Sequence, residues 1–165
     1  MVTEPTWEAT VATAAEDAVT ATSWWDPAPD VDWVAWGNSL PFARDIGMEC
    51  IALESDSAVF RMDRSVLTIN PNGAVNGGLV AAGADQVMGA LARRNGDRGD
   101  LPATATLHIQ YHLPALPPLT FRATTLGGGR NIKFIEVVVL DANGNRCATS
   151  TGTMAAGRLP LPRQS

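Results

Sequence analysis

One carboxylate stands alone in a long stretch of small and apolar residues. From Gly77 to Ala92 every side chain is small or apolar except those of the neighbours Asp85 and Gln86, and only Asp85 can carry a charge. A carboxylate inside such a segment would lose hydration and destabilise the fold unless hydrogen bonds or charges compensated it. Asp85 is therefore a candidate for chemistry rather than for stability, although a position on a sliver of exposed surface is the plainer alternative.

Two glycines just before this stretch offer a complementary group. Gly77 and Gly78 stand at an expected helix start, where free backbone N–H groups and the helix dipole favour negative charge. Such donors can hold a developing oxyanion, and a side chain there would obstruct a ligand. Asp85 lies roughly 12 Å of helix rise beyond Gly77. An extended thioester or ester could span the two groups, particularly if they come from facing helices of two subunits.

The helix that carries these groups is predicted over residues 75–94. Four apolar residues recur there at the 4, 3, 4 spacing of one helix face, namely Val80, Ala84, Val87 and Leu91. The opposite side is almost as apolar, which is typical of a buried helix. Gly83 and Gly89 are expected to allow close approach of another backbone.

Six β-rich runs surround this helix in the sequence, at residues 48–55, 57–64, 103–113, 119–127, 132–141 and 146–157. The last two are joined by DANGNR, whose Asn-Gly is a strong hairpin signal. The pattern predicts an α+β fold, in which an antiparallel sheet of five or six strands wraps around a long central helix.

The chain divides into two predicted regions. Residues 41–165 hold the strands and the central helix, whereas residues 1–40 form a helical arm that contains all five tryptophans. Within the arm we expect a weak helix over residues 6–22 and a short helical piece around Val31 to Trp36. The tryptophans either pin the arm onto the body or line a ligand pocket.

Composition excludes several classes of protein. With 165 residues, 45% hydrophobic and 18% charged, the chain is predicted to be globular with one main core. A net charge of -5 argues against a nucleic-acid partner. Residues 1–60 carry eleven acidic side chains and one basic one, so an anionic ligand should meet the later part of the chain. No run is apolar enough to span a membrane and the N-terminus lacks a signal-peptide pattern, so a cytoplasmic location is expected.

Metal and triad chemistry find little support. Cys50 and Cys147 are too few for a disulfide framework or a metal site and are expected to be buried and reduced. His108 and His112 would lie roughly 13 Å apart on a strand, too far for one metal ion. No G-x-S-x-G elbow is present to support a serine triad. We therefore predict neither a metal nor a cofactor.

The segment around Asp85 resembles a known family. Asn70, Gly73, Gly77, Gly78 and Asp85 match the spacing found in hotdog-fold acyl-CoA thioesterases of the phenylacetyl-CoA (PaaI-like) and 4-hydroxybenzoyl-CoA group. In that pattern an Asn or Gln is followed by Gly, then His-Gly-Gly, then an acid nine residues beyond the His. The resemblance extends from about Pro41 to Gly157. The family's His is replaced by Asn76, which can still cap the helix by accepting from a backbone N–H.

The resemblance implies thioester hydrolysis at a subunit interface. Asp85 would act as general base on water or as nucleophile, and the Gly77 N–H would polarise the thioester carbonyl. Asn70 would help to hold the water. Thr104 falls where some relatives place a hydroxyl that contacts the same water, although it could be an ordinary strand residue. The implied assembly is a homodimer or homotetramer.

Gly127-Gly128-Gly129, followed by Arg130 and Lys133, has two readings. It is either a flexible hairpin or, as the resemblance suggests, the place where Arg130 and Lys133 meet the phosphates of an acyl-CoA.

Two functions other than hydrolysis stay open: an enoyl-CoA hydratase or dehydratase, which in hotdog relatives pairs a His with the acid, and a non-catalytic acyl-CoA sensor. The acyl group, whether aryl, short or medium-chain, is not determined.

Overall fold

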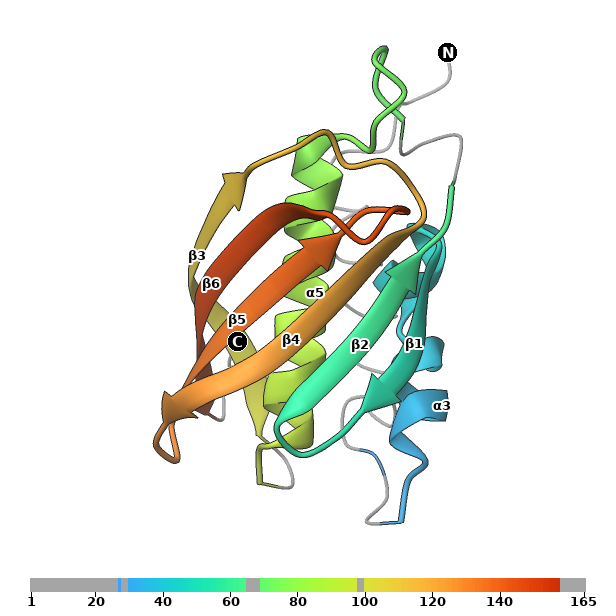
Figure 1. The fold of residues 1–165 in the computed structure, drawn as a ribbon. Coiled ribbons are helices and arrows are strands. Elements are labelled where there is room, and N and C mark those ends of the chain that lie inside the picture. Colours follow the sequence, from blue (N-terminus) through green and yellow to red (C-terminus); the bar gives the residue numbers. More distant parts are fainter. Residues whose placement is uncertain (1–26, 28–29, 65–68, 98–99, 158–165) are drawn as a thin grey trace, which may run out of the picture.

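The structure, a computed structural model, describes Pro27 and residues 30–64, 69–97 and 100–157. In this part of the chain a single six-stranded sheet curls around one long helix (Figure 1). The α+β fold predicted from the sequence is therefore confirmed. The helix expected over residues 6–22 lies outside the described residues, and so does most of the tryptophan-rich arm.

All six predicted strands are present, with ends that differ from the prediction by a few residues. They are β1 (Met48–Leu53), β2 (Ser57–Met62), β3 (Leu101–Tyr111), β4 (Leu119–Gly128), β5 (Ile132–Leu140) and β6 (Arg146–Gly157). Every neighbouring pair is antiparallel, and the strand order is β1-β2-β4-β5-β6-β3. β1 and β3 therefore form the two edges of the sheet.

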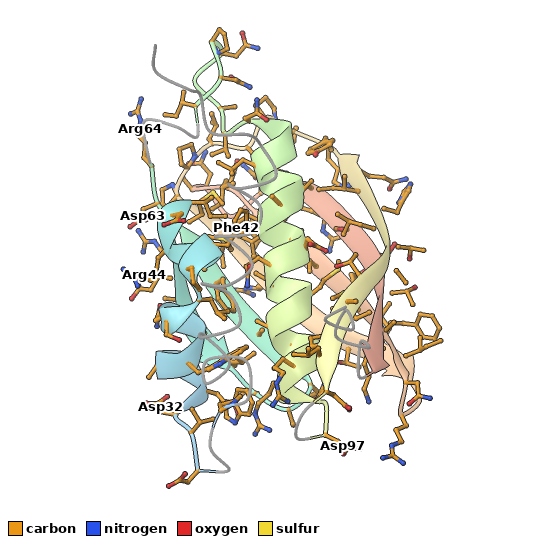
Figure 2. The ribbon with its side chains drawn as sticks, turned by 180° about the vertical axis from the view of Figure 1, so that it is seen from behind. Asp32, Phe42, Arg44, Asp63, Arg64 and Asp97 are labelled. Carbon is orange, nitrogen blue, oxygen red and sulfur yellow. The ribbon has the colours of Figure 1, made fainter. Side chains whose placement is uncertain are left out.

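The central helix α5 (Gly77–Arg94) packs against the inner face of the sheet (Figure 2). The predicted apolar stripe is confirmed, because Val80, Ala84, Val87 and Leu91 are all fully buried. The two helix glycines behave differently. A Cβ at Gly83 would lie 3.0 Å from the ring of Phe121, so Gly83 allows close packing of a side chain rather than the predicted close approach of another backbone.

For Gly89 the expectation of close backbone approach is wrong. A Cβ at Gly89 would have Met154 Cε as its nearest neighbour, at 3.8 Å, which is ordinary van der Waals contact. The expectation of a helix buried all round is also wrong for the single chain. Ala81, Ala82, Asp85 and Gln86 are partly exposed on α5. Asp85 thus lies on an accessible strip of the helix.

Two short helices precede the sheet, α3 (Trp33–Ser39) and α4 (Pro41–Asp45). α3 begins after Asp32, whose carboxylate accepts from the N–H groups of Val34 and Ala35 at 3.0 and 3.1 Å. Its buried face joins the core through Trp36, which is 5% exposed. The described end of the arm is therefore pinned to the body, whereas the division of the chain at residue 40 stays a prediction.

α3 also covers the outer edge of β1. The Asn38 side-chain nitrogen donates to the Cys50 carbonyl at 3.0 Å, and the Cys50 N–H donates to the Asn38 oxygen at 2.9 Å. Gly37 permits this approach, because a Cβ there would lie 2.7 Å from Cys50 Sγ. Burial, with the negative charges of Asp32 and Glu49, raises the pKa of Cys50 to about 12. Cys50 and Cys147 are both buried and free, as expected.

The Asn-Gly turn joins β5 to β6 as a hairpin, as predicted. Gly144 adopts a φ of 80°, and the Asp141 carboxylate accepts from the N–H groups of Asn143 and Asn145 at 2.9 and 2.8 Å. Burial alone would raise the pKa of Asp141, but these hydrogen bonds outweigh it and hold that pKa below its usual value.

Among the described helices, none is both long and apolar enough to cross a membrane.

Candidate active site

The structure joins Asp85 to Thr104. The Thr104 hydroxyl, on β3, donates to the Asp85 Oδ1 carboxylate oxygen at 2.7 Å. The other carboxylate oxygen forms no hydrogen bond with a described residue. A neutral donor thus holds the carboxylate in one orientation and leaves an oxygen available to a ligand or a water molecule.

A β-bulge explains why Thr104 can reach the helix. Along β3, Thr106 pairs with Thr153 on the outer face of the sheet, and strict alternation would place Thr104 on that face too. The register shifts between Thr104 and Thr106, so that Thr104 instead pairs with Met154, a buried residue of the inner face. Bulges commonly re-aim a side chain in this way beside a functional site.

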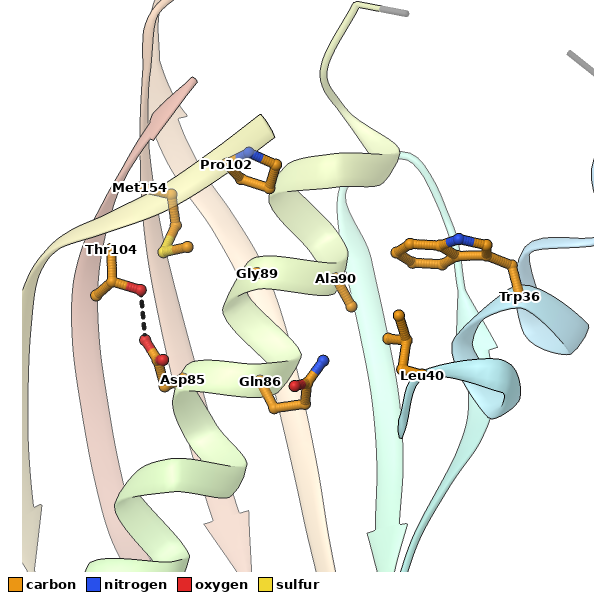
Figure 3. A pocket seen from close by; sticks show the side chains of 9 residues that line it. All are labelled: Trp36, Leu40, Asp85, Gln86, Gly89, Ala90, Pro102, Thr104 and Met154. Carbon is orange, nitrogen blue, oxygen red and sulfur yellow. Dashed lines mark hydrogen bonds between the residues drawn. The ribbon is translucent and has the colours of Figure 1, made fainter. Parts of the chain in front are cut away.

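Asp85 opens into a cavity of about 140 Å³. Figure 3 shows the Asp85–Thr104 pair at one end of this cavity and Trp36 with Leu40 at the other, with Gln86 between them. Trp36 and Leu40 are 5% and 2% exposed, so this end is closed by the core. Trp36 thus pins α3 onto the body, as one of the two alternatives for the tryptophans predicts, and it also lines this cavity.

The N-terminus of α5 is organised by Asn76. Its side-chain oxygen accepts from the Gly78 N–H at 2.8 Å, which confirms the predicted cap. The N–H of Gly78 is therefore bound in the cap, whereas the N–H of Gly77 forms no hydrogen bond with a described residue. The Tyr111 hydroxyl donates to the Gly77 carbonyl, and a Cβ at Gly77 would lie 3.4 Å from that ring. One backbone donor at this helix end is thus free of hydrogen bonds to the described residues.

Asn70 shapes the loop before α5. Its side-chain oxygen accepts from the N–H groups of Asn72 and Ala74 at 2.9 and 3.2 Å, which forms a side-chain-stabilised turn. The oxygen is thereby used within the loop. Asn70 and Gly77 share a cavity of about 280 Å³ that does not include Asp85. Within one chain, the predicted oxyanion donor and the predicted acid therefore line separate cavities.

The glycine-rich segment is the hairpin between β4 and β5. Gly128 adopts a φ of 132°, and a Cβ there would collide with the Ile132 carbonyl. Arg130 Nε lies 3.3 Å from Asp97 Oδ2, just beyond the end of α5, and both side chains are largely exposed. Lys133 lies partly buried near the start of β5. Neither cation lines the cavity of Asp85.

Both histidines lie away from Asp85. His108 pairs with Thr151 on the outer face of the sheet, and His112 Nε2 lies 3.0 Å from the Thr149 hydroxyl on the same face. The chain has no other histidine. Within the described residues no group of three or more His, Cys, Asp or Glu side chains could hold a metal ion.

Sequence reasoning assigned no role to Tyr111, Gln86 or Met154. Tyr111 is the only tyrosine of the chain, but it contacts Gly77 across 34 positions, which only the closing of β3 over α5 brings about. Gln86 stands out in the sequence as the second polar residue of the apolar stretch, but nothing in its spacing indicates that it lines the cavity. Met154 reaches the cavity because β6 pairs with the bulged strand.

Comparison with known proteins agrees with this architecture. A model of the thioesterase superfamily matches residues 72–148. A candidate esterase of Thermoplasma acidophilum is 25% identical over 113 residues, which cover 68% of this chain and 85% of that protein. A thioesterase of Haemophilus influenzae superposes with a TM-score of 0.72 at 20% identity, covering 86% of this chain and 100% of that one.

Two further solved structures share the fold. The PaaI protein of E. coli, from the phenylacetic acid degradation operon, has a TM-score of 0.65 at 18% identity over 73% of this chain and 91% of its own. A Streptococcus mutans protein bound to acetyl-CoA has a TM-score of 0.61 at 20% identity over 67% and 88%. The superfamily match and these folds together confirm that the chain is a hotdog-fold protein resembling the thioesterases.

Proposed function

We propose that this protein hydrolyses the thioester of an acyl-CoA to a free acid and CoA. The observation that carries the proposal is the Asp85 carboxylate, held by Thr104 at 2.7 Å at one end of a cavity. The match to the thioesterase superfamily supports thioester hydrolysis in general. The acetyl-CoA bound by the Streptococcus mutans neighbour supports the choice of CoA.

In the first form of the mechanism, Asp85 acts as a general base. Its free oxygen takes a proton from a water molecule while the water oxygen attacks the thioester carbonyl. The negative charge that develops on the carbonyl oxygen is stabilised by the Gly77 N–H at the start of α5. The C–S bond then breaks, the acid is released, and the proton on Asp85 passes to the leaving thiolate.

In the second form, Asp85 is the nucleophile. Its carboxylate attacks the carbonyl directly, the CoA thiolate leaves, and water hydrolyses the resulting mixed anhydride. The hydrogen bond from Thr104 serves both forms, because it orients the carboxylate without protonating it. A hydratase that pairs a His with the acid is disfavoured, because His108 and His112 both belong to the other face of the sheet.

Either form requires a second copy of the chain. Gly77 and Asp85 of one helix are separated by roughly 12 Å of rise, and they line different cavities. β3 is an edge strand whose inner face leaves Leu107 37% and Tyr111 51% exposed. Two copies related by a two-fold axis through β3 would cover these side chains and set Gly77 of one copy against Asp85 of the other.

The first test is a panel of acyl-CoA substrates assayed by release of free thiol. We expect turnover of at least one substrate, and a loss of about a hundredfold or more in Asp85→Asn, the scale for removal of a positioned base. The variant should fold normally and still bind acyl-CoA in calorimetry. Glu49→Gln, which neutralises an exposed acid on β1, serves as the matched control and should retain wild-type rates.

The outcomes of this panel separate the candidate functions. Wild-type rates in Asp85→Asn would remove Asp85 from the mechanism. Binding of acyl-CoA without turnover of any substrate would favour the sensor, and hydration of an enoyl-CoA without thiol release would favour the hydratase.

The second test concerns the CoA phosphates, which we assign to Arg130 and Lys133. Arg130→Ala should raise the apparent KM for acyl-CoA several-fold and blunt its salt dependence, with little change for a truncated pantetheine thioester. Asp97→Asn is the complementary variant, because it removes the carboxylate that neighbours Arg130 at 3.3 Å and should lower that KM. Equal effects of Arg130→Ala on both substrates would contradict the assignment.

A further inference from the structure

The closed end of the Asp85 cavity is a fixed aromatic wall. Trp36 packs edge-on against Trp33, with ring centroids 5.3 Å apart and an interplanar angle of 73°. The Arg94 guanidinium, in the last turn of α5, lies 5.0 Å from the centre of the Trp33 ring. These contacts tie Trp36 to the helix that carries Asp85. The distance from the carboxylate to the wall is therefore set by packed rings rather than by a loop.

The shape of the cavity decides which part of a thioester can enter it. The lining beyond the Asp85–Thr104 pair is mostly apolar, with Leu40, Ala90 and Met154 among its side chains. CoA is large, polar and charged, so it must lead outward to solvent. Only the acyl group ends in an apolar terminus that can lie against the buried Trp36 and Leu40 end of this cavity.

Gly89 is the second residue that bears on the shape of the cavity, because the packing around it does not require a glycine. Glycine in the interior of a helix is less favourable than alanine, and a Cβ at Gly89 would meet only Met154 Cε, at 3.8 Å. Gly89 nevertheless lines the cavity, one helix turn beyond Asp85 (Figure 3). What the missing side chain provides at this position is volume in the cavity.

We propose that Trp36 and Gly89 determine which size of acyl group the cavity accepts. Trp36 forms the end wall of the cavity, and Gly89, which has no side chain, leaves space along the helix. This inference rests on the proposed thioester hydrolysis. A cavity of about 140 Å³ is close to the volume of about 150 Å³ that holds a benzene molecule in an engineered protein core. The acyl group is therefore a single ring or a short chain of similar volume, and long chains are excluded.

The experiment compares kcat/KM for acetyl-, butanoyl-, benzoyl-, octanoyl- and dodecanoyl-CoA. Wild type should prefer butanoyl- or benzoyl-CoA. In Gly89→Ala the ratio of benzoyl to acetyl activity should fall by about tenfold or more, the usual effect of one methyl group in a tight pocket. In Trp36→Leu the ratio of octanoyl to butanoyl activity should rise by a similar factor. Phe134→Leu, which shortens an exposed aromatic on the outer face, is the control and should leave both ratios unchanged.

Thermal melting separates a change of specificity from a loss of folding. Gly89→Ala should melt at or above the wild-type temperature, so it tests the proposal even if Trp36→Leu, which opens the core, fails to fold. Unchanged ratios in folded Gly89→Ala would overturn the proposal, as would efficient hydrolysis of dodecanoyl-CoA by the wild type.

Failure of the proposed function gives a different result. If the wild type hydrolyses no substrate, the same series is measured by calorimetric binding. A shift of binding preference in Gly89→Ala would then support the size-setting role without hydrolysis, whereas no binding of any acyl-CoA would overturn both proposals.

Discussion

The two edges of the sheet differ in whether the chain itself covers them. At the β1 edge, α3 covers the strand, and Asn38 binds both the N–H and the carbonyl of Cys50. At the β3 edge no other strand follows in the described chain, and most of the strand is exposed on both faces (Figure 1). Bare edges of this length are an aggregation risk unless something pairs with them. The chain covers one edge by itself, and the other is the edge at which we propose that a second copy binds.

The open edge also provides the strand that contacts the proposed catalytic groups. Thr104, which orients Asp85, and Tyr111, which contacts Gly77, both belong to β3. By contrast, helix α3 at the closed edge supplies Trp36, which lines the far end of the Asp85 cavity. A partner added at β3 would therefore complete the proposed site, whereas the β1 side would only shape it.

The largest expected effect on oligomeric state and activity comes from a charge placed on the open edge, β3. Leu107→Glu places a charge on the inner face of β3, where Leu107 is 37% exposed. The charge would have to be buried against the second copy, so the dimer should dissociate. Because the Gly77 donor and Asp85 would then separate, thiol release should fall by about a hundredfold or more, the scale for loss of an oxyanion donor. Light scattering and the thiol assay measure the two effects.

Ile51→Glu is the matched control at the closed edge. Ile51 is an apolar residue of β1 and is 49% exposed, so the same charge enters a position at least as accessible as that of Leu107. Its oligomeric state and activity should stay at wild-type values. If Leu107→Glu remains an active dimer, or if Ile51→Glu dissociates instead, the assignment of the two edges is wrong.

Local patterns predicted most of this fold. β-rich runs located all six strands, the 4, 3, 4 spacing located α5, and Asn-Gly located the last hairpin. Each of these signals depends on residues that are close in the sequence, so it can be recognised without knowledge of the tertiary packing. The same locality explains the failure at Gly89, since only the finished fold shows that its missing side chain faces a cavity instead of another backbone.

The site was less predictable because it depends on long-range events. Strand alternation would have turned Thr104 outward, and only the bulge beside it directs its hydroxyl to Asp85. Motif spacing placed Gly77 and Asp85 on one helix but could not show that they line separate cavities. The wall at Trp36 arises from a helix outside the motif. The roles of these residues stay predictions until they are tested.

A smaller effect is expected from opening the closed edge. Asn38→Ala removes both hydrogen bonds to Cys50 and leaves an N–H and a carbonyl without these partners. Loss of such partly buried bonds should lower the free energy of unfolding by about 2 kcal/mol. Denaturant titration measures this loss, and light scattering should still show the wild-type oligomer. A stable Asn38→Ala, or one that changes oligomeric state, would mean that α3 does not seal this edge.

The smallest effect is expected at a second asparagine, Asn76, which lies beside the helix end that β3 contacts. Asn76 caps α5 beside Gly77, and Tyr111 of β3 holds the same helix end. Asn76→Ala should cost about 1 kcal/mol of stability, the usual value of a cap. Unlike Asn38→Ala, it should also slow thiol release, because the loop that aims the Gly77 N–H loses its register. Asn76→His, which restores the residue of the resembling family and can also accept a hydrogen bond, should keep a substantial part of the activity. If Asn76→Ala loses stability but keeps its full rate, the cap is structural only and the carbonyl is not held at this helix end.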